Sequence, residues 1–282
     1  MANIRELDPS ASPLDYFGYE LRRRREAAGM RLADLGSAIF CTGSLIGQIE
    51  TAKKVPTREF AERADAALMT DGCFSRLVGL VLRSQLPSWF QAYAEMEAKA
   101  TYISTYQAQV VYGLLQTEAY ARAVLGAPQP DNLDELVGAR LERQRLLGKK
   151  HPPVVWVVLD EAVLYRPMGS REVMREQLAH LLSFRDQRRL KIQVLPFSAG
   201  QHPGLPGAFN LLRFDDHPDI AYTEDFIQGH MTANPDAVSE GWLHYDQLRA
   251  SALSVRDSAE LIAHVMEERY ADESTAEGRD VA

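Results

Sequence analysis

A short stretch of the chain combines polar side chains that would face solvent with a pair of cations. Isoleucines within residues 44–51 recur at the spacing of one buried helical face, so Ser44 and Gln48 would lie on the opposite face. Lys53 and Lys54 follow in the next loop. Polar side chains of this kind read base edges in the major groove, and nearby cations hold the phosphates. The pattern indicates recognition of double-stranded DNA, with a protein-binding helical module as the alternative.

A second set of polar residues could serve catalysis or metal binding. They follow predicted strands, at Asp160, Glu161, His202, His217, Glu224 and Asp225. If such groups converged, they could form a hydrolytic or metal site. Their spacings match no ligand or nucleophile motif, and carboxylates at strand ends commonly cap helices or pair with arginines. We therefore expect no catalytic residue, metal or cofactor, and an enzyme carried to DNA by the first domain is the less favoured alternative.

The chain has 282 residues and a net charge of −8, but the charge is unevenly distributed. Between Glu20 and Arg58, eight basic residues stand against four acidic ones, whereas residues 71–282 contain 21 basic and 29 acidic residues. A basic segment in an acidic protein indicates an anionic partner for that segment, or a solvated helix face. The longest apolar run, Val154–Leu159, is far shorter than the roughly 18 residues that span a bilayer. We therefore expect a cytoplasmic protein without membrane contacts.

The first 70 residues predict four short helices. Apolar residues recur at helical spacing over residues 14–28, 32–39, 44–51 and 57–68. Gly29 would end the first helix, and Thr42 or Ser44 would cap the third. Two short helices joined by a tight turn, the second of them polar on its outer side, suit insertion into a major groove.

Two strings in this segment carry a family resemblance: LRRRREAAG at residues 21–29 and IGQIETAKKVP at residues 46–56. They resemble helix-turn-helix proteins of the Cro/C1 type (the XRE family), where the second string forms the recognition helix and the following loop. The resemblance implies that four residues face the bases of an operator: Thr42, Gly43, Ser44 and Gln48. It implies phosphate contacts from Arg22, Lys53, Lys54 and Arg58. We expect a homodimer, because two-fold symmetry pairs half-sites about 34 Å apart.

Three positions depart from the family pattern. Phe40 stands where the turn usually has Gly, so its backbone either avoids positive φ or tolerates strain. Gly43 occupies a position that often carries a base-reading side chain, and Ala52 replaces a common loop Gly. Readout would therefore depend on few side chains. Gln48 is the best candidate, because a bidentate Gln–adenine contact discriminates by about 1–3 kcal/mol.

Beyond residue 75 the pattern becomes mixed. Helical spacing extends over residues 77–82, 89–103, 116–125, 133–147, 171–184, 238–250 and 258–268. Strand patterns cover residues 154–159, 191–196, 208–214 and 220–223. The first two strands with the helix between them predict a right-handed βαβ crossover, and the last two predict a hairpin.

Together these patterns predict a multidomain α + α/β protein. An all-α helix-turn-helix bundle is expected at residues 14–75, followed at residues 76–270 by a larger mixed α/β domain with about four or five strands. The polar, acidic residues 271–282 would form a mobile tail.

Several strings between residues 85 and 266 carry a second resemblance. They include Trp89-Phe90, GLLQTEAYAR at residues 113–122, ARLERQ at 139–144, VLDEAVL at 158–164 and VLPF at 194–197. In this order they resemble the actinobacterial domain family DUF5753, which typically follows a Cro/C1-type helix-turn-helix. Tyr112 departs from the pattern, because the family usually has Pro before Gly-Leu-Leu-Gln-Thr.

This second resemblance implies an antitoxin-like or WhiJ-like transcriptional regulator, whose C-terminal domain binds a small DUF397 protein. A small-molecule effector in place of the protein partner is the alternative. The family supplies no catalytic residue. Candidate partner or ligand contacts are Trp89, Gln116, Thr117, Arg122, Arg143 and Glu161. Each also has a structural interpretation: an aromatic residue in the core, a helix cap or a surface ion pair.

Overall fold

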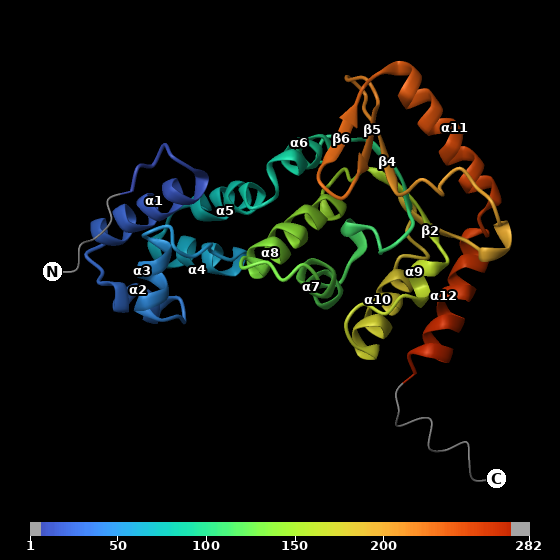
Figure 1. The fold of residues 1–282 in the computed structure, drawn as a ribbon. Coiled ribbons are helices and arrows are strands. Elements are labelled where there is room, and N and C mark those ends of the chain that lie inside the picture. The colour runs from blue at the N-terminus through green and yellow to red at the C-terminus, as the bar shows by residue number, and fades with distance from the viewer. Residues whose placement is uncertain (1–6, 272–282) are drawn as a thin grey trace, which may run out of the picture. The chain divides into compact units, whose positions relative to one another are not determined.

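The computed structural model describes residues 7–271, in which the chain divides into two compact units after Ser88 (Figure 1). The predicted tail at residues 271–282 lies outside this range, apart from Ala271. The first unit contains α1 (Pro13–Ala27), α2 (Leu32–Ala38), α3 (Gly43–Ile49), α4 (Arg58–Leu68) and α5 (Cys73–Ser84). The four predicted helices are confirmed, and a fifth joins them.

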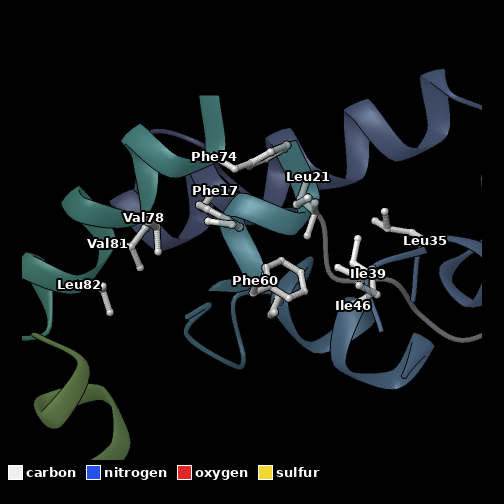
Figure 2. Close-up of a cluster of buried hydrophobic side chains, with 13 residues drawn as sticks. Phe17, Leu21, Leu35, Ile39, Ile46, Phe60, Phe74, Val78, Val81 and Leu82 are labelled. Carbon is white, nitrogen blue, oxygen red and sulfur yellow. The ribbon is translucent and has the colours of Figure 1, made fainter. Parts of the chain in front are cut away.

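The core of the first unit receives apolar side chains from all five helices (Figure 2). It consists of Phe17, Leu21, Leu35, Ile39, Ile46, Ile49, Phe60, Ala61, Ala64, Phe74, Val78, Val81 and Leu82. The rings of Phe17 and Phe74 lie 5.1 Å apart. Because α5 supplies four of these residues, the first unit extends past the boundary expected at residue 75. Asp65 of α4 also ties α5 to this unit, because its carboxylate accepts the backbone N–H groups of Phe74 and Ser75.

The helix ends follow local signals in the sequence. Gly29 has φ +67° just beyond α1, as expected for a helix stop. Thr42, rather than Ser44, caps α3 by accepting the N–H of Leu45 at 3.2 Å. Thr57 caps α4 in the same way.

The second unit is built on a six-stranded mixed sheet with the order β3-β2-β1-β4-β5-β6. The strands are β1 (Tyr102–Gln107), β2 (Val154–Asp160), β3 (Leu190–Leu195), β4 (Phe209–Arg213), β5 (Ile220–Glu224) and β6 (Gly229–Thr232). β1, β2 and β3 are parallel, whereas β4, β5 and β6 are antiparallel to their neighbours. The βαβ crossover and the β4–β5 hairpin are therefore confirmed.

Two strands were not predicted from the sequence. β1 lies partly inside the stretch expected to be helical over residues 89–103, and that expectation is wrong at its C-terminal end. Its residues, YISTYQ, are rich in β-branched and aromatic types, and its four central residues are buried, so side chains on both faces of the sheet are covered. β6 has four residues and begins with Gly, so its sequence carries little strand signal.

Helices cover both faces of the sheet. They are α6 (Ser88–Glu97), α7 (Glu118–Gly126), α8 (Leu133–Gln144), α9 (Ala162–Tyr165), α10 (Arg171–Ser183), α11 (Pro235–Ser251) and α12 (Val255–Arg269), with short 3₁₀ turns η1 (Gly113–Leu115), η2 (Arg145–Gly148) and η3 (Phe197–Ala199). Tyr245 and Leu248 of α11 pack on Tyr106, Val158 and Leu211 of the sheet. Figure 1 shows α11 on the opposite side of the sheet from α7 and α8.

A buried carboxylate at the end of α6 fixes α8 and η1 next to it. Glu97 accepts two hydrogen bonds from the guanidinium of Arg143, both at 2.9 Å, and hydroxyl bonds from Tyr93 and Tyr112 at 3.1 and 2.7 Å. The Arg143 guanidinium also lies 4.5 Å from the ring centre of Phe90. Burial, followed by the negative charge of Glu97, raises the pKa of both tyrosines well above 10, so their hydroxyls stay protonated and donate. The charge of Glu97 is thus fully compensated.

Arg143→Ala should destabilise the second unit by about 3–5 kcal/mol, because it leaves the Glu97 carboxylate buried without a cation. The exposed pair of Arg122 and Asp134, at 2.7 Å, provides the control. Arg122→Ala should cost less than about 1 kcal/mol. Urea unfolding followed by tryptophan fluorescence measures both values, since all three tryptophans lie in the second unit. If both variants lost the same free energy of unfolding, the buried ion pair would not stabilise the second unit more than an exposed one does.

Candidate nucleic-acid interface

α2 and α3 meet at a close crossing that glycine makes possible. The two helices form a pair bent by 107°. A Cβ on Gly36 would lie 2.8 Å from the carbonyl oxygen of Cys41, and one on Gly43 would lie 3.1 Å from the amide nitrogen of Ala33. Position 43 therefore faces α2, and a side chain there would press on the backbone of α2. Packing thus accounts for glycine at this position.

Within residues 7–271, no single helix is long and apolar enough to cross a membrane. By length and composition alone, only the bent pair of α2 and α3 within these residues is long and apolar enough.

The turn between α2 and α3 adopts the glycine-like conformation without glycine. Phe40 has φ +60°, and Ala52, in the loop after α3, has φ +53°. The backbone of Phe40 therefore takes the strained positive φ and does not avoid it. This conformation costs about 1–2 kcal/mol for an L-residue. The Phe40 ring is 84% exposed and lies 5.7 Å from the Arg63 guanidinium.

The outer face of α3 carries the polar side chains that the sequence assigned to it. Ser44 and Gln48 are exposed, and so is Thr42 at the N-cap, whereas Ile46 and Ile49 are buried. The Thr42 hydroxyl oxygen accepts the N–H of Leu45 and keeps its own O–H available as a donor. Three hydroxyl and amide groups are thus presented on one exposed surface.

The predicted phosphate-binding cations have different surroundings. Lys53 is exposed in the loop after α3, and Lys54 next to it is half-buried. Arg22 donates to the carbonyl oxygen of Glu50 at 2.9 Å, and Arg58 donates to the carbonyl oxygen of Ser75 at 3.2 Å. Both arginines therefore contribute to holding the first unit together.

Most of the arginine run at the end of α1 is engaged in ion pairs within the first unit, although Arg23 stays exposed and Arg24 half-buried. Arg23 and Arg24 pair with Glu20 at 2.6 and 2.7 Å, and the hydrogen bond from Arg23 is the main cause that lowers the pKa of Glu20. Arg25 is buried and makes two hydrogen bonds to the Glu50 carboxylate, at 2.6 and 2.8 Å. The charge count along the chain indicates a basic segment here, but it does not identify the Arg25–Glu50 pair at the end of α3.

The candidate contacts in the second unit all have internal partners or partial burial. Trp89 is 37% exposed and packs against Phe90. Gln116 is buried, donates to Val111 and accepts from Arg140, both at 2.7 Å. Thr117 caps α7, and Arg122 pairs with Asp134. Arg143 pairs with Glu97, as described above, and Glu161 accepts the N–H of Phe197 at 2.7 Å. Thr117 and Arg122 thus have the cap and surface ion-pair roles considered for them, whereas Gln116 and Arg143 form buried contacts.

The carboxylates and histidines considered for catalysis do not all meet. Asp160 lies near His202, at 3.9 Å, and accepts the Tyr106 hydroxyl at 3.1 Å. Glu224 instead accepts from Tyr222, and Asp225 contacts His230 in the β5–β6 turn. Among residues 7–271, no group of three or more His, Cys, Asp or Glu side chains is arranged to hold a metal ion.

The turn at Tyr112 keeps the backbone that proline would give. Tyr112 has φ −52°, within the range that a proline ring enforces. Its side chain adds the hydroxyl bond to Glu97, which proline lacks. The departure from the family pattern therefore leaves the turn in place and connects it to the buried ion pair.

Comparison with known families agrees with this geometry. Residues 90–264, more than half of the chain, match the family described as Domain of unknown function (DUF5753). The chain belongs to the DUF5753 family. Residues 17–73 match a helix-turn-helix domain, which includes α2, its turn and α3. No curated protein and no solved structure matches the chain. In this DUF5753 protein the helix-turn-helix domain indicates a DNA-binding regulator rather than an enzyme.

Ala52→Gly should stabilise the first unit by about 0.5–1 kcal/mol, because glycine adopts positive φ without steric strain. The same change at Ala66, an exposed helical position in α4, should destabilise it by about 1 kcal/mol. Thermal unfolding followed by far-ultraviolet circular dichroism measures both. Destabilisation by both changes would show that Ala52 is not strained.

Proposed function

We propose that this protein is a sequence-specific transcriptional regulator that reads an operator with α3. The observation that carries this proposal is the exposed polar face of α3, where Ser44 and Gln48 lie opposite the buried Ile46 and Ile49. Thr42 extends this face at the N-cap. A helix of this kind fits the major groove, and Gln48 can make the bidentate contact that adenine requires. Gly43 contributes only its backbone, because position 43 faces α2.

The phosphate contacts in this proposal come mainly from the loop after α3. Lys53 is exposed there, and Lys54 follows it. Arg22 and Arg58, which also bond to Glu50 and Ser75, are the further phosphate contacts in the proposal. Cations on both sides of a reading helix fix its register on the duplex.

The rest of the proposal concerns assembly and regulation. One seven-residue helix reads few base pairs, so we propose a homodimer on a two-fold operator. The DUF5753 domain binds a regulatory partner, and a small DUF397 protein is the proposed one, in an antitoxin-like arrangement. Partner binding changes DNA affinity to the extent that the partner distinguishes the free from the bound state. A gel shift of the gene's own promoter fragment, with and without the DUF397 protein, tests DNA binding and the effect of the partner on DNA affinity.

Gln48→Ala should weaken binding to the specific promoter fragment by about 1–3 kcal/mol and leave binding to random DNA nearly unchanged. The change removes a base contact and no charge. Gln247→Ala, at an exposed position of α11, is the matched control and should alter neither affinity. Competition gel shifts with specific and random duplexes measure the ratio. An equal loss on both duplexes would remove Gln48 from the base contacts.

Lys53→Ala should lower affinity for all DNA sequences and reduce the slope of log affinity against log salt by about one unit. Each phosphate contact releases about one counterion, which is the physical origin of that slope. Lys150→Ala, an exposed lysine in the second unit, should leave the slope as it is. Fluorescence anisotropy across a salt series gives both slopes. If the slope of the Lys53 variant equals that of the unmodified protein, Lys53 does not contact phosphate.

A further inference from the structure

The two edge strands of the six-stranded sheet, β3 and β6, have different surroundings. At the β3 edge, the backbone of Val194 is occupied from outside the sheet. Its carbonyl oxygen accepts the N–H of Leu253 at 2.9 Å, and its N–H donates to the Ser258 hydroxyl at 2.9 Å. Gln193 adds a side-chain bond to the carbonyl oxygen of Leu253 at 2.7 Å. The connection from α11 to α12 therefore closes this edge to any further strand.

The β6 edge has no such cover in the part of the chain that the structure describes. Within residues 7–271, β6 pairs with β5 on one side, and no backbone group of another element bonds to its other side. Natural proteins protect an open edge with lysine, proline, a bulge or a very short strand, and of these β6 has only the last, with four residues. The sequence Gly-His-Met-Thr of β6 contains no lysine or proline, and both His230 and Met231 are exposed. This edge is suited to accept another strand.

The turn that leads into β6 presents two large apolar side chains to solvent. Phe226 is fully exposed, and Ile227 is 79% exposed. Asp225 connects the two ends of this turn, because its carboxylate accepts the N–H groups of Ile227 and Gln228 and contacts the His230 ring at 2.7 Å. These bonds, led by that from Gln228, lower the pKa of Asp225 to about 2. An ordered turn that exposes Phe and Ile next to an open strand edge is typical of a binding surface.

The negative charge around β6 indicates which kind of partner fits this edge. Residues 214–248 contain eight acidic residues and no Lys or Arg. Glu224 and Asp225 flank the start of β6, and Asp236 and Glu240 lie exposed on α11, which follows its end. An approaching strand thus meets negative charge near both ends of β6. Such a field attracts a basic segment and disfavours both nucleic acid and a second acidic copy of this edge.

We propose that β6 and the Asp225–Gln228 turn are the docking site for an extended, positively charged segment of a partner protein. The segment adds to the sheet as a seventh strand beside β6. Its backbone pairs with the open edge of β6, its lysine or arginine side chains meet the flanking carboxylates, and its apolar side chains cover Phe226 and Ile227. This inference rests on the partner-binding part of the proposed function and identifies where and what the DUF5753 domain binds.

The test uses labelled synthetic peptides of about nine residues, near the upper end of the usual range of strand lengths. One alternates Lys with Val, the second alternates Glu with Val, and the third is the Lys-Val peptide methylated on every second backbone nitrogen. Fluorescence anisotropy with the full chain should show the Lys-Val peptide binding about tenfold or more tightly than either of the others. Amide hydrogen exchange should show new protection in Gly229–Thr232. Equal affinity of all three peptides, or protection elsewhere, overturns the proposal.

Two matched variants locate the site. Phe226→Ser combined with Ile227→Ser should weaken binding of the Lys-Val peptide about tenfold. Phe197→Ser combined with Leu205→Ser, at positions 61% and 69% exposed elsewhere in the same unit, should leave it unchanged. A loss in both double variants, or in neither, contradicts the assignment of the turn. A change of oligomeric state in sedimentation with no change in peptide affinity also contradicts it, because it assigns the edge to a second copy of the chain.

The promoter gel shift separates this inference from the proposed function. Both double variants should shift promoter DNA like the unmodified protein, since α3 is intact. If the unmodified protein shifts no DNA but binds the Lys-Val peptide, the DNA-reading proposal fails and the docking site stands. If it shifts DNA but binds no peptide, the docking site fails and the DNA-reading proposal stands.

Discussion

The position of α3 depends on a carboxylate that is buried at the end of that helix. The Glu50 side chain is 3% exposed, so its charge needs a partner within the protein. Arg25 of α1 supplies it through two hydrogen bonds, and the same guanidinium donates to the carbonyl oxygen of Met30 at 2.8 Å. One side chain thereby joins α1, the loop before α2 and the end of α3. The face that α3 presents to solvent is set by residues that do not themselves lie on that face.

Ion pairs with glutamates also lower the net positive charge of the arginine run in α1. A run of four arginines in α1 indicates a strongly basic surface when residues are counted along the chain. Three of the four pair with Glu20 or Glu50 in ion pairs within 2.8 Å. Glu20 pairs with both Arg23 and Arg24, so these two glutamates offset only part of the positive charge of the run, and its surface potential is lower than the count of arginines indicates. The second unit repeats the arrangement with Glu97 and Arg143, so in each unit a buried glutamate orients neighbouring helices.

Periodicity and caps were enough to predict most of the fold. The helices of the first unit, the crossover from β2 to β3 and the β4–β5 hairpin all follow from apolar spacing and from signals such as Gly29 and Thr57. β1 was missed because a strand with both faces buried has no alternating pattern to distinguish it from a helix end. The apolar spacing that predicts the helix α3 also predicts its polar outer face, because the buried isoleucines define the opposite side. The Arg25–Glu50 pair joins residues 25 positions apart, and only tertiary structure brings them together.

The closed β3 edge sets the stoichiometry of whatever the sheet binds. A sheet with two open edges can add strands at both ends, and identical sheets can then stack side by side into a fibre. Here the Leu253 and Ser258 bonds to Val194 remove one of those ends. A strand added beside β6 is then the one strand that this sheet takes up directly, which corresponds to one partner strand per chain.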